Sequence, residues 1–528
     1  MSVKLSLALL AICLGQALSQ DIAVPSQCAT IAEGSELTLT ANSSSVHWGY
    51  VYNGLEPNLI ASSGDIINIE MITHHAGDDI AKMVTGDPGV EDIYKWAPTG
   101  QNVYMRGKSG SGDGVHILTG PVYVCGAEPG DVLQIDVLDL KPRANPSTGK
   151  TYGSNAAAWW GYQFRAGFLD GDEREVITIY EVVDEDGSCY AVPDYQFRFS
   201  GGDTGYPGPT TPCVTANGSV PEAYPGFNFE WSNAAEIYSG TNVQCVNDTQ
   251  TWARYDYPGI ITTHPTGTED DSIKGKFKIP CNFHIGNIGL APKYNTTVDS
   301  VPPLVTGGNM DNRRIGIGST LFLPVEVAGA FFSAGDAHTA QGDSELDGTG
   351  IETSINGKFK ITLHKADALP LVVDGLKQPL IETADHWVVQ GYTYADYLNE
   401  LPDPMSTIYS ESSIDKAMTV AYNNTRDWMM KTLDMTEDMV ITAITVGVDF
   451  GVTQVVDGNW GVHAVVPKKP FGLPTVGATT KSADTSAPTA SADGASAPAA
   501  NSGAGKIITT GFGGVIGALM MFGAFLMA

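Results

Sequence analysis

The chain has little positive charge. Its 528 residues include 29 lysines and arginines against 59 aspartates and glutamates, which gives a formal net charge of −30. A surface this acidic repels phosphate groups, so the composition argues against nucleic acid and anionic membrane surfaces as partners. It suits an extracellular protein that is kept soluble by charge repulsion.

Several common enzyme motifs are also missing. The sequence contains no GxSxG nucleophile elbow, no Walker phosphate loop and no GxGxxG fingerprint. These motifs mark α/β-hydrolases, P-loop nucleotide hydrolases and dinucleotide-binding enzymes. No two cysteines have the CxxC spacing that a cysteine-based zinc site would need. Any chemistry must therefore come from other residues.

The first residues have the features of a signal peptide. Lys4 supplies a positive charge, Leu5–Leu14 form an apolar core too short to span a bilayer, and Ala17–Ser19 offer a cleavage site. We predict that residues 1–19 are removed and that the chain is secreted. Six cysteines then remain, an even number that favours disulfides in an oxidising compartment. They are Cys28, Cys125, Cys189, Cys213, Cys245 and Cys281.

Two details of the cysteine pattern lead to specific hypotheses. Cys125 lies in the apolar stretch PVYVCGAEPGD, so the alternative to a disulfide is a buried free thiol. Residues 184–275 are rich in proline, glycine, asparagine and tyrosine, which is typical of an elaboration on the surface of a core. We expect a disulfide between Cys213 and Cys245 to hold this inserted region.

The C-terminal segment predicts a lipid anchor. Residues 476–503 are rich in serine, alanine and proline, which cannot bury enough apolar surface to fold, and we interpret them as a stalk. Residues 504–528 end in an apolar tail with no lysine or arginine behind it, the pattern of a GPI-anchor signal. Attachment at Ser502 would place the protein on the outer leaflet of the plasma membrane. The alternative is a single-pass tail anchor, which a basic flank would favour.

Potential glycosylation sites agree with this location. Asn-x-Ser/Thr sequons mark surface positions in secreted proteins. The predicted N-glycosylation sites are Asn42, Asn217, Asn247, Asn295 and Asn423.

Residues 20–475 have a predominantly β pattern. Sixty glycines and thirty prolines separate short β-type runs. Ser412 is the predicted N-cap of one helix, whose apolar face includes Ala417, Met418 and Ala421. We predict a mainly β fold with a β-sandwich-like core and mixed α+β elements in a single large domain. The predicted strands are Glu36–Ala41, Asp65–Thr73, Val115–Val124, Val132–Leu138, Glu175–Val183, Lys358–His364, Val440–Phe450 and Gly461–Val466.

The run Gly307–Glu352 carries the strongest functional signal. It places Asp336, His338, Gln341, Asp343 and Glu345 directly after an apolar stretch. In an extended strand, residues two apart share a face, so the aspartate and the histidine are expected to point the same way. A carboxylate and an imidazole on one face form half of a metal or hydrolytic site.

This run resembles the acetamidase/formamidase family, whose corresponding segment reads approximately GGNxD…GS…PV…GA…GDxHxxQGDGE…G…IE. There are two departures: Ser344 stands where the family usually has glycine, and Thr349-Gly350 only loosely follow the usual small residues before Ile-Glu. Further blocks are similar to the family from Val46 to Phe471, apart from the inserted region. They read SVHWGYVYNGLEP, GVHILTGPVYVCGAEPGDVLQIDVLDLKPR, IGNIGLAP and DFGVTQVVDGNWGVHAVVPK.

The resemblance implies an enzyme that hydrolyses short linear amides, such as formamide or acetamide, to ammonia and a carboxylate. It also implies a β-rich fold and assembly into homo-oligomers. At the cell surface, such an enzyme would suit nitrogen scavenging.

Amide hydrolysis needs an activated nucleophile, a group that stabilises the oxyanion and a proton donor for nitrogen. Because no serine nucleophile motif is present and secreted cysteines favour disulfides, water activated by a divalent metal is the remaining route. Zinc fits a His/Asp ligand set best, with manganese and iron as alternatives. We predict His116, Asp336 and His338 as ligands, Glu345 as the general base or acid, and Gln341 as a substrate-binding residue.

Each assignment has a structural alternative. Asp336 could bond backbone in a turn, His116 could be a core histidine, and Glu345 could be a solvated loop charge. The tandem pair His74 and His75, followed by Asp78 and Asp79, is a reserve source of ligands, and only one of the two histidines is expected to face a site. His47 is a further reserve ligand. His463 could face inward and the pair Trp159-Trp160 could line a small pocket, although core packing is the favoured role for these residues.

Two other functions remain compatible with the sequence. The first is a non-catalytic surface protein that keeps the fold, because fold alone does not establish activity. The second is a related hydrolase that acts on lactams or esters, because loops outside the motifs decide pocket shape.

Overall fold

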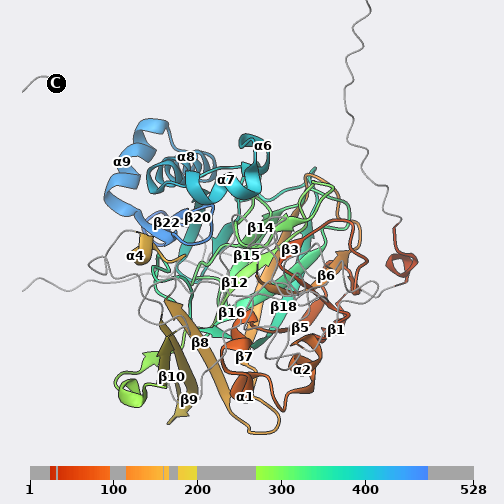
Figure 1. Cartoon of the computed structure of the whole chain (residues 1–528). Coiled ribbons are helices and arrows are strands. Elements are labelled where there is room, and N and C mark those ends of the chain that lie inside the picture. The colour runs from red at the N-terminus through yellow and green to blue at the C-terminus, as the bar shows by residue number, and fades with distance from the viewer. Residues whose placement is uncertain are drawn as a thin grey trace, which may run out of the picture. The chain divides into compact units, whose positions relative to one another are not determined.

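The computed structural model (Figure 1) consists of two units, residues 1–479 and residues 480–528. All described residues belong to the first unit. The predicted signal peptide, stalk, anchor signal and Ser502 lie outside them. The described residues are 24–30, 34–94, 115–157, 160–165, 176–198 and 269–473.

Two large β-sheets and one short β-pair form the described part of the unit. The first sheet has the order β1 (Glu36–Leu39), β5 (Ile66–Met71), β18 (Ile355–His364), β7 (Val132–Pro142), β15 (Thr320–Pro324), β19 (Leu380–Glu382), β20 (His386–Tyr392), β22 (Gly461–Pro467) and β21 (Asp449–Gln454). The second has the order β11 (Ile279–Pro280), β10 (Ser188–Arg198), β9 (Val176–Glu185), β8 (Thr151–Ala157), β17 (Glu352–Thr353), β16 (Phe332–His338), β12 (His284–Gly289) and β14 (Gly307–Asn309). Strand β6 (Ile117–Val124) joins the second sheet by pairing with β16, β2 (Val46–Trp48) and β4 (Leu59–Ala61), while β3 (Tyr50–Val51) pairs with β13 (Val298–Asp299).

The two large sheets share one hydrophobic core, so the mainly β fold with a sandwich-like core is confirmed. On β18, Ile355, Phe359 and Ile361 are buried, whereas the lysines between them face outward, as the two-residue period of a strand dictates. The same cluster contains Phe332 of the opposite sheet, whose ring meets Phe359 edge to face at 6.2 Å. The inward row of each sheet therefore fills the space between them.

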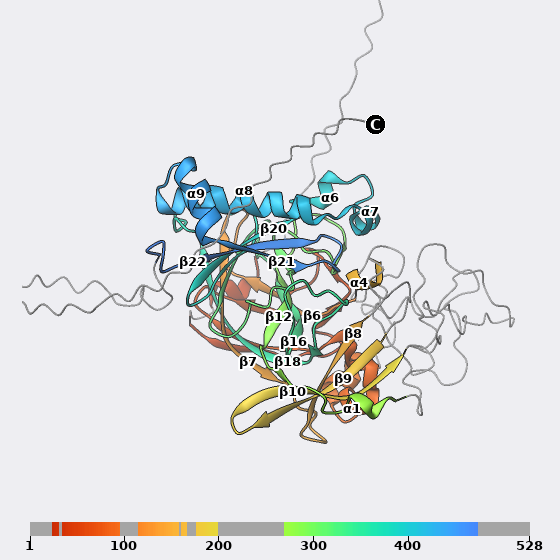
Figure 2. The same cartoon turned by 90° about the vertical axis from the view of Figure 1, so that its left-hand side faces the viewer.

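Helices cover one end of the first sheet (Figures 1 and 2). Helix α8 (Ile414–Leu433) packs on β20 and β22, and α9 (Glu437–Gly447) follows it. No helix among the described residues is long and apolar enough to cross a membrane. The other helical segments are η1 (Ser26–Ala29), η2 (His74–Asp79), α1 (Ile80–Met83), α2 (Pro88–Tyr94), α4 (Tyr162–Arg165), η4 (Asp271–Ile273), α6 (Tyr397–Glu400) and α7 (Pro404–Glu411).

Two local predictions need correction here. Helix α8 is capped by Ser413, which accepts from the Lys416 backbone N–H, and not by Ser412. Met418, assigned to the buried face, is 37% exposed.

The predicted strand Val440–Phe450 is mostly helix α9, because Thr436 caps it and its two buried residues are four positions apart. Tertiary packing here outweighs the β propensity of a sequence rich in valine, isoleucine and threonine.

Two disulfides are present among the described residues. Cys28 pairs with Cys125, which excludes the free-thiol alternative, and Cys189 at the start of β10 pairs with Cys281. The proposed Cys213–Cys245 pair lies outside the described residues. The region 184–275 begins within β9, and its first strand, β10, pairs along the whole of β9.

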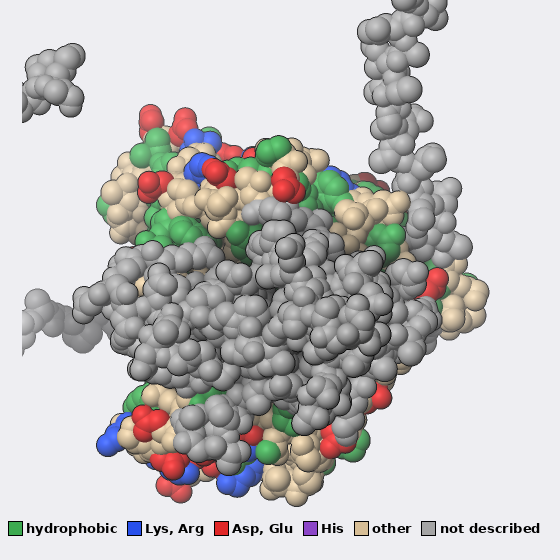
Figure 3. Space-filling model, viewed as in Figure 1, with side chains coloured by type: hydrophobic (Ala, Val, Ile, Leu, Met, Phe, Trp, Pro, Cys, Tyr) green, Lys and Arg blue, Asp and Glu red, His purple; other side chains and the backbone are tan. Residues whose placement is uncertain are grey.

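On the face drawn in Figure 3, acidic side chains are scattered among basic and apolar ones over the described surface. Among the described residues visible in this view, no single acidic patch stands out.

A buried ion pair offers a test of this fold. Arg143 donates to both carboxylate oxygens of Asp87, at 2.6 and 3.0 Å, and these side chains are 14% and 3% exposed. Burial raises the pKa of Asp87, but the hydrogen bonds and charge of Arg143 outweigh it and hold that pKa below its usual value. We expect Arg143→Met to lower the free energy of unfolding at neutral pH by about 3–5 kcal/mol, because it leaves a buried charge unpaired.

The effect of this substitution depends on pH. A depressed carboxyl pKa contributes stability above the unfolded-state pKa and loses it as pH falls through the folded-state pKa. The difference between wild type and Arg143→Met should therefore shrink in acid. Urea unfolding at neutral and acid pH measures this difference. Lys358→Met, at the exposed pair with Glu36, is the control and should change stability far less. An equal loss at both pH values would contradict the assignment.

Candidate metal centre

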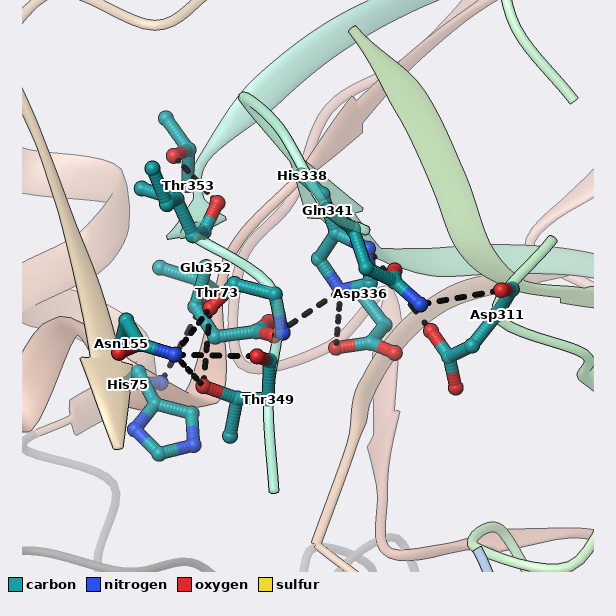
Figure 4. Close-up of polar contacts among 12 residues, drawn as sticks. Thr73, His75, Asn155, Asp311, Asp336, His338, Gln341, Thr349, Glu352 and Thr353 are labelled. Atoms are coloured by element: carbon teal, nitrogen blue, oxygen red, sulfur yellow. Dashed lines mark hydrogen bonds and ion pairs between the residues drawn. The ribbon is translucent and has the colours of Figure 1, made fainter. Parts of the chain in front are cut away.

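Strand pairing in the second sheet builds the centre. His338 at the end of β16 lies directly opposite His284 of β12 on one side and Glu352 of β17 on the other. Paired residues on neighbouring strands point to the same face, so these three side chains form a row. Strand β6 pairs with the earlier part of β16 on the same edge as β17, and His116 immediately precedes β6. Figure 4 shows His338, Asp336, Gln341 and Asp311 converging.

Asp336 is the hub of the cluster. Its carboxylate lies 3.5 Å from His116 Nε2, 3.7 Å from His74 Nδ1 and 3.7 Å from His338 Nε2. The side chain is 3% exposed. The structure thus brings together the three predicted ligands and adds His74 from the reserve group.

The reason why Asp336 and His338 meet differs from the predicted one. Asp336 has φ +51°, the left-handed region, within a strand that is otherwise extended. The simple alternation of an extended strand does not hold at this residue. Such a backbone costs roughly 1 kcal/mol or more for a non-glycine residue and persists where surrounding structure imposes it, often at functional sites.

The donor set fits a metal ion. The separations of 3.5–3.7 Å around Asp336 exceed hydrogen-bond length. They are close to the roughly 3.3–3.5 Å that separates two ligands of a tetrahedral ion with bonds of about 2.0–2.1 Å. His74 Nδ1 is buried without a hydrogen-bond partner, and His338 Nε2 lies 2.9 Å from Glu352 Oε1. Unpaired buried nitrogens facing a carboxylate are typical of a metal site, and His116, Asp336 and His74 form one such group.

Gly286 of β12 opens space at the centre. A Cβ at this position would lie 2.3 Å from Asp311 Oδ1, 2.6 Å from Asp336 Oδ2 and 2.7 Å from the His338 ring. Three side chains therefore converge on the face of this glycine. Only a residue without a side chain leaves that space free.

Only one of the two tandem histidines reaches the centre. His74 and His75 lie in the 3-10 helix η2 and not at the end of a strand. His74 faces Asp336, whereas His75 Nδ1 is 2.7 Å from Asp78, which also accepts from Ser154. Asp79 accepts from Tyr195 at 2.6 Å. These contacts leave His75, Asp78 and Asp79 in a supporting network beside the centre.

Acidic side chains surround the remaining sides. Carboxylate oxygens of Asp311, Glu345 and Asp457 lie within 4.8 Å of one another, and Glu345 and Glu352 form a similar group with His338. Asp311 Oδ1, Glu345 Oε2 and Asp457 Oδ2 have no hydrogen-bond partner. Glu345 is 6% exposed, so the alternative that it is a solvated loop charge does not hold.

The pKa directions follow from this crowding. Burial and the neighbouring carboxylates raise the pKa of Glu345 well above its usual value, and burial with Asp336 raises that of Asp311 to about 6. Burial opposes ionisation of Asp336, but the histidines His116 and His338 hold its pKa well below the usual value. Burial lowers the pKa of His116, which favours the neutral imidazole that a metal requires.

His284 and Gln341 support the row of ligands. His284 Nδ1 lies 2.6 Å from the Asn282 carbonyl, and its Nε2 lies 3.1 Å from His338 Nδ1. Gln341 places Oε1 3.1 Å from His284 Nε2 and donates through Nε2 to the Asp311 carbonyl at 3.0 Å. Because both polar atoms of Gln341 contact the protein, its position favours a role in orienting ligands over the predicted contact with substrate.

The other candidates lie elsewhere. His47 bonds the Tyr50 carbonyl and Ser333, and His463 bonds Thr453, so both have internal partners. Trp160 donates to the Gly348 carbonyl, while Trp159 lies outside the described residues. Asp343 pairs with Arg314 near the surface. Of the sequons, Asn295 is exposed, Asn42 and Asn423 are half-buried, and Asn217 and Asn247 lie outside the described residues.

Sequence reasoning missed four members of the cluster. Asp311, His284, Glu352 and Asp457 come from four separate segments, and none was chosen. Asp311, Glu352 and Asp457 do occur within the blocks GGNMDN, GIE and VVDGNWG that carry the resemblance. The motif blocks themselves were therefore the available signal for these residues, because the blocks contain more polar residues than the exposed face of a strand accounts for.

A β-sandwich with buried histidines and carboxylates at its strand ends defines a class of fold able to hold a catalytic metal. The model of the acetamidase/formamidase family matches residues 111–469. The chain belongs to this family.

Individual relatives are more distant. The chain is 28% identical over 239 residues to an acetamidase of Mycolicibacterium smegmatis, across 44% of this chain and 49% of that protein. It is 27% identical over 296 residues to a putative formamidase of Schizosaccharomyces pombe, across 53% and 60%. The chain thus spans about half the length of the curated relatives it matches. The crystal structure of a predicted acetamidase/formamidase from Thermoanaerobacter tengcongensis aligns with this chain with a TM-score of 0.49 and 17% sequence identity. The alignment covers 83% of this chain and 99% of that one.

Proposed function

We propose that the protein is an amidase that hydrolyses short linear amides, such as formamide or acetamide, with the aid of a divalent metal, zinc being the best fit. The observation that carries this proposal is the convergence of His74, His116 and His338 on the buried Asp336. Membership of the acetamidase/formamidase family supports the amide as substrate. The reaction consumes one water and releases a carboxylate and ammonium.

The ion, when bound, would supply Lewis-acid chemistry by polarising the amide carbonyl and lowering the pKa of a water molecule. His116, Asp336 and His338, joined by His74, would hold it. Glu345, with its proton in place, would act as the general acid toward the departing nitrogen, and its carboxylate would then take the proton that the attacking water releases. Its neighbours Asp311 and Asp457 favour a proton on this group, because ionisation would add a third adjacent negative charge.

Burial of the centre supports a small substrate. The exposed fractions of Asp336, His338, His116 and Glu345 lie between 0% and 6%. Such a site excludes bulk water and strengthens the electrostatic contacts made to a developing oxyanion. It suits one-carbon and two-carbon amides better than bulky lactams or esters.

Location at the cell surface is part of the proposal. Two disulfides among the described residues suit a secreted protein. We propose that residues 1–19 direct secretion, that Ser502 carries a GPI anchor, that the sequons carry glycans, and that the enzyme forms a homo-oligomer. Release by a phosphatidylinositol-specific phospholipase, but not by salt, would support the anchor, and retention of the protein on the membrane after that treatment would contradict it.

Ammonia release tests the activity. The purified full-length protein should release ammonia from formamide and acetamide, lose this activity after removal of metal by a chelator, and regain it with zinc, manganese or iron. Lactams and esters of similar size should have lower kcat/KM. A protein with no stoichiometric metal and no turnover would be a non-catalytic surface protein, while faster turnover of a lactam or ester would replace the amide as substrate.

A further inference from the structure

The donor groups around Asp336 fall into two sets. His74 and His116 form one set with Asp336, and Asp311 and His338 form a second set with the same carboxylate. His116 approaches Oδ2, and His74 and His338 both approach Oδ1. Donors therefore gather at both oxygens of this carboxylate, and a carboxylate that is shared by two donor sets can bridge two ions.

Charge at the centre exceeds what a single ion balances. Five carboxylates that are at most 7% exposed crowd the site, and no lysine or arginine among the described residues pairs with any of them. With a proton on Glu345, four carboxylates remain to be balanced; one divalent cation offsets two negative charges, and two offset four. Because an uncompensated buried charge is costly, the site favours two bound divalent cations over one. The five are Asp311, Asp336, Glu345, Glu352 and Asp457.

Unpartnered atoms occur in both sets. His74 Nδ1 lacks a hydrogen-bond partner in the first set, and Asp311 Oδ1 lacks one in the second. The space above Gly286 lies between Asp311, Asp336 and His338, within 2.7 Å of all three for an added Cβ. The three atoms nearest to this space thus belong to the three residues of the second set.

His284 holds the His338 ring in place. His284 Nδ1 lies 2.6 Å from the Asn282 carbonyl, and its Nε2 lies 3.1 Å from His338 Nδ1. This contact engages Nδ1 of His338, whose Nε2 lies 3.7 Å from Asp336 Oδ1 and 2.9 Å from Glu352 Oε1. A ligand histidine fixed through its other nitrogen is a common feature of metal sites.

We propose that the centre binds two divalent cations bridged by Asp336, one held by His74 and His116 and the other by Asp311 and His338. Nitrogen and oxygen donors suit zinc, manganese or cobalt. The inference goes beyond the proposed function, which needs one ion, and it rests on the metal in that proposal but not on the substrate.

Metal counting and electron paramagnetic resonance test the inference without activity. The purified full-length protein is stripped with a chelator, reloaded separately with Zn²⁺ and Mn²⁺, and freed of excess metal. Elemental analysis should give two ions per chain, and the Mn²⁺ form should give a spin-coupled signal. One ion per chain with an uncoupled signal overturns the inference but leaves the proposed function intact, whereas no bound ion overturns both.

Two near-isosteric variants assign the sites. His74→Asn and Asp311→Asn should each reduce the content from two ions to one and remove spin coupling. His364→Asn, half-buried and bonded to Gln134 away from the centre, is the matched control and should keep both ions. Circular dichroism verifies folding, and the wild-type count stands even if a variant fails to fold. Two ions retained in both variants would overturn the assignment.

Discussion

Asp336→Asn is expected to reduce kcat/KM for amide hydrolysis by at least about a thousandfold, because it removes the charge on which three histidines converge. Asparagine is nearly the same size and tolerates the left-handed backbone at this position, φ +51°, so the fold should be preserved. Steady-state ammonia release measures the loss of activity, and elemental analysis measures the loss of bound metal. The two losses should appear together.

Asp343→Asn is the matched control for that change. Asp343 lies in the same motif but pairs with Arg314 near the surface, so its loss should change kcat/KM by less than about threefold, in line with the small energy of exposed pairs. An Asp336→Asn variant that keeps its metal and activity within about tenfold of wild type would refute the role of Asp336 as the hub of the centre.

Gly286→Ala is expected to have the second largest effect. The new methyl group would lie 2.3–2.7 Å from Asp311, Asp336 and His338, so these side chains must move. A shift of about 1 Å at a catalytic site can reduce rate by about a hundredfold. We therefore expect a loss of metal content and a fall in kcat/KM of that order, with a stability change of about 1–3 kcal/mol from overpacking.

Gly342→Ala separates this effect from the general cost of replacing a glycine. Gly342 belongs to the same functional motif, but its side-chain direction is open, with no atom within 4 Å of an added Cβ. It should retain wild-type metal content and activity. If Gly286→Ala also keeps both, the space above Gly286 is not part of the metal centre.

The sequence by itself predicted a mainly β fold because strands alternate buried and exposed residues with a period of two, as β5 and β18 do. The same local logic failed for α9, whose β-branched residues favour a strand until a capping threonine and packing against the sheet are considered. It also selected Ser412 over Ser413 as the cap of α8, because both serines precede the same apolar face.

For the site, the motif around Asp336 and His338 was enough to predict that this segment lies at the centre. It was not enough to select partners. His74 comes from η2, and Asp311 and Asp457 come from loops after other strands, so no spacing in the sequence relates them to one another. His284 reaches His338 only because β12 and β16 pair in that register.

Composition, strand period and the motif blocks therefore determined the class of fold, the family resemblance and one wall of the candidate site. Tertiary structure alone decided that His74 faces Asp336 and His75 does not, and that Asp311 and Gly286 share one space with His338. The physical reason is range: hydrophobic period and capping act over a few residues, whereas a metal site requires donors from distant segments to meet within a few ångströms.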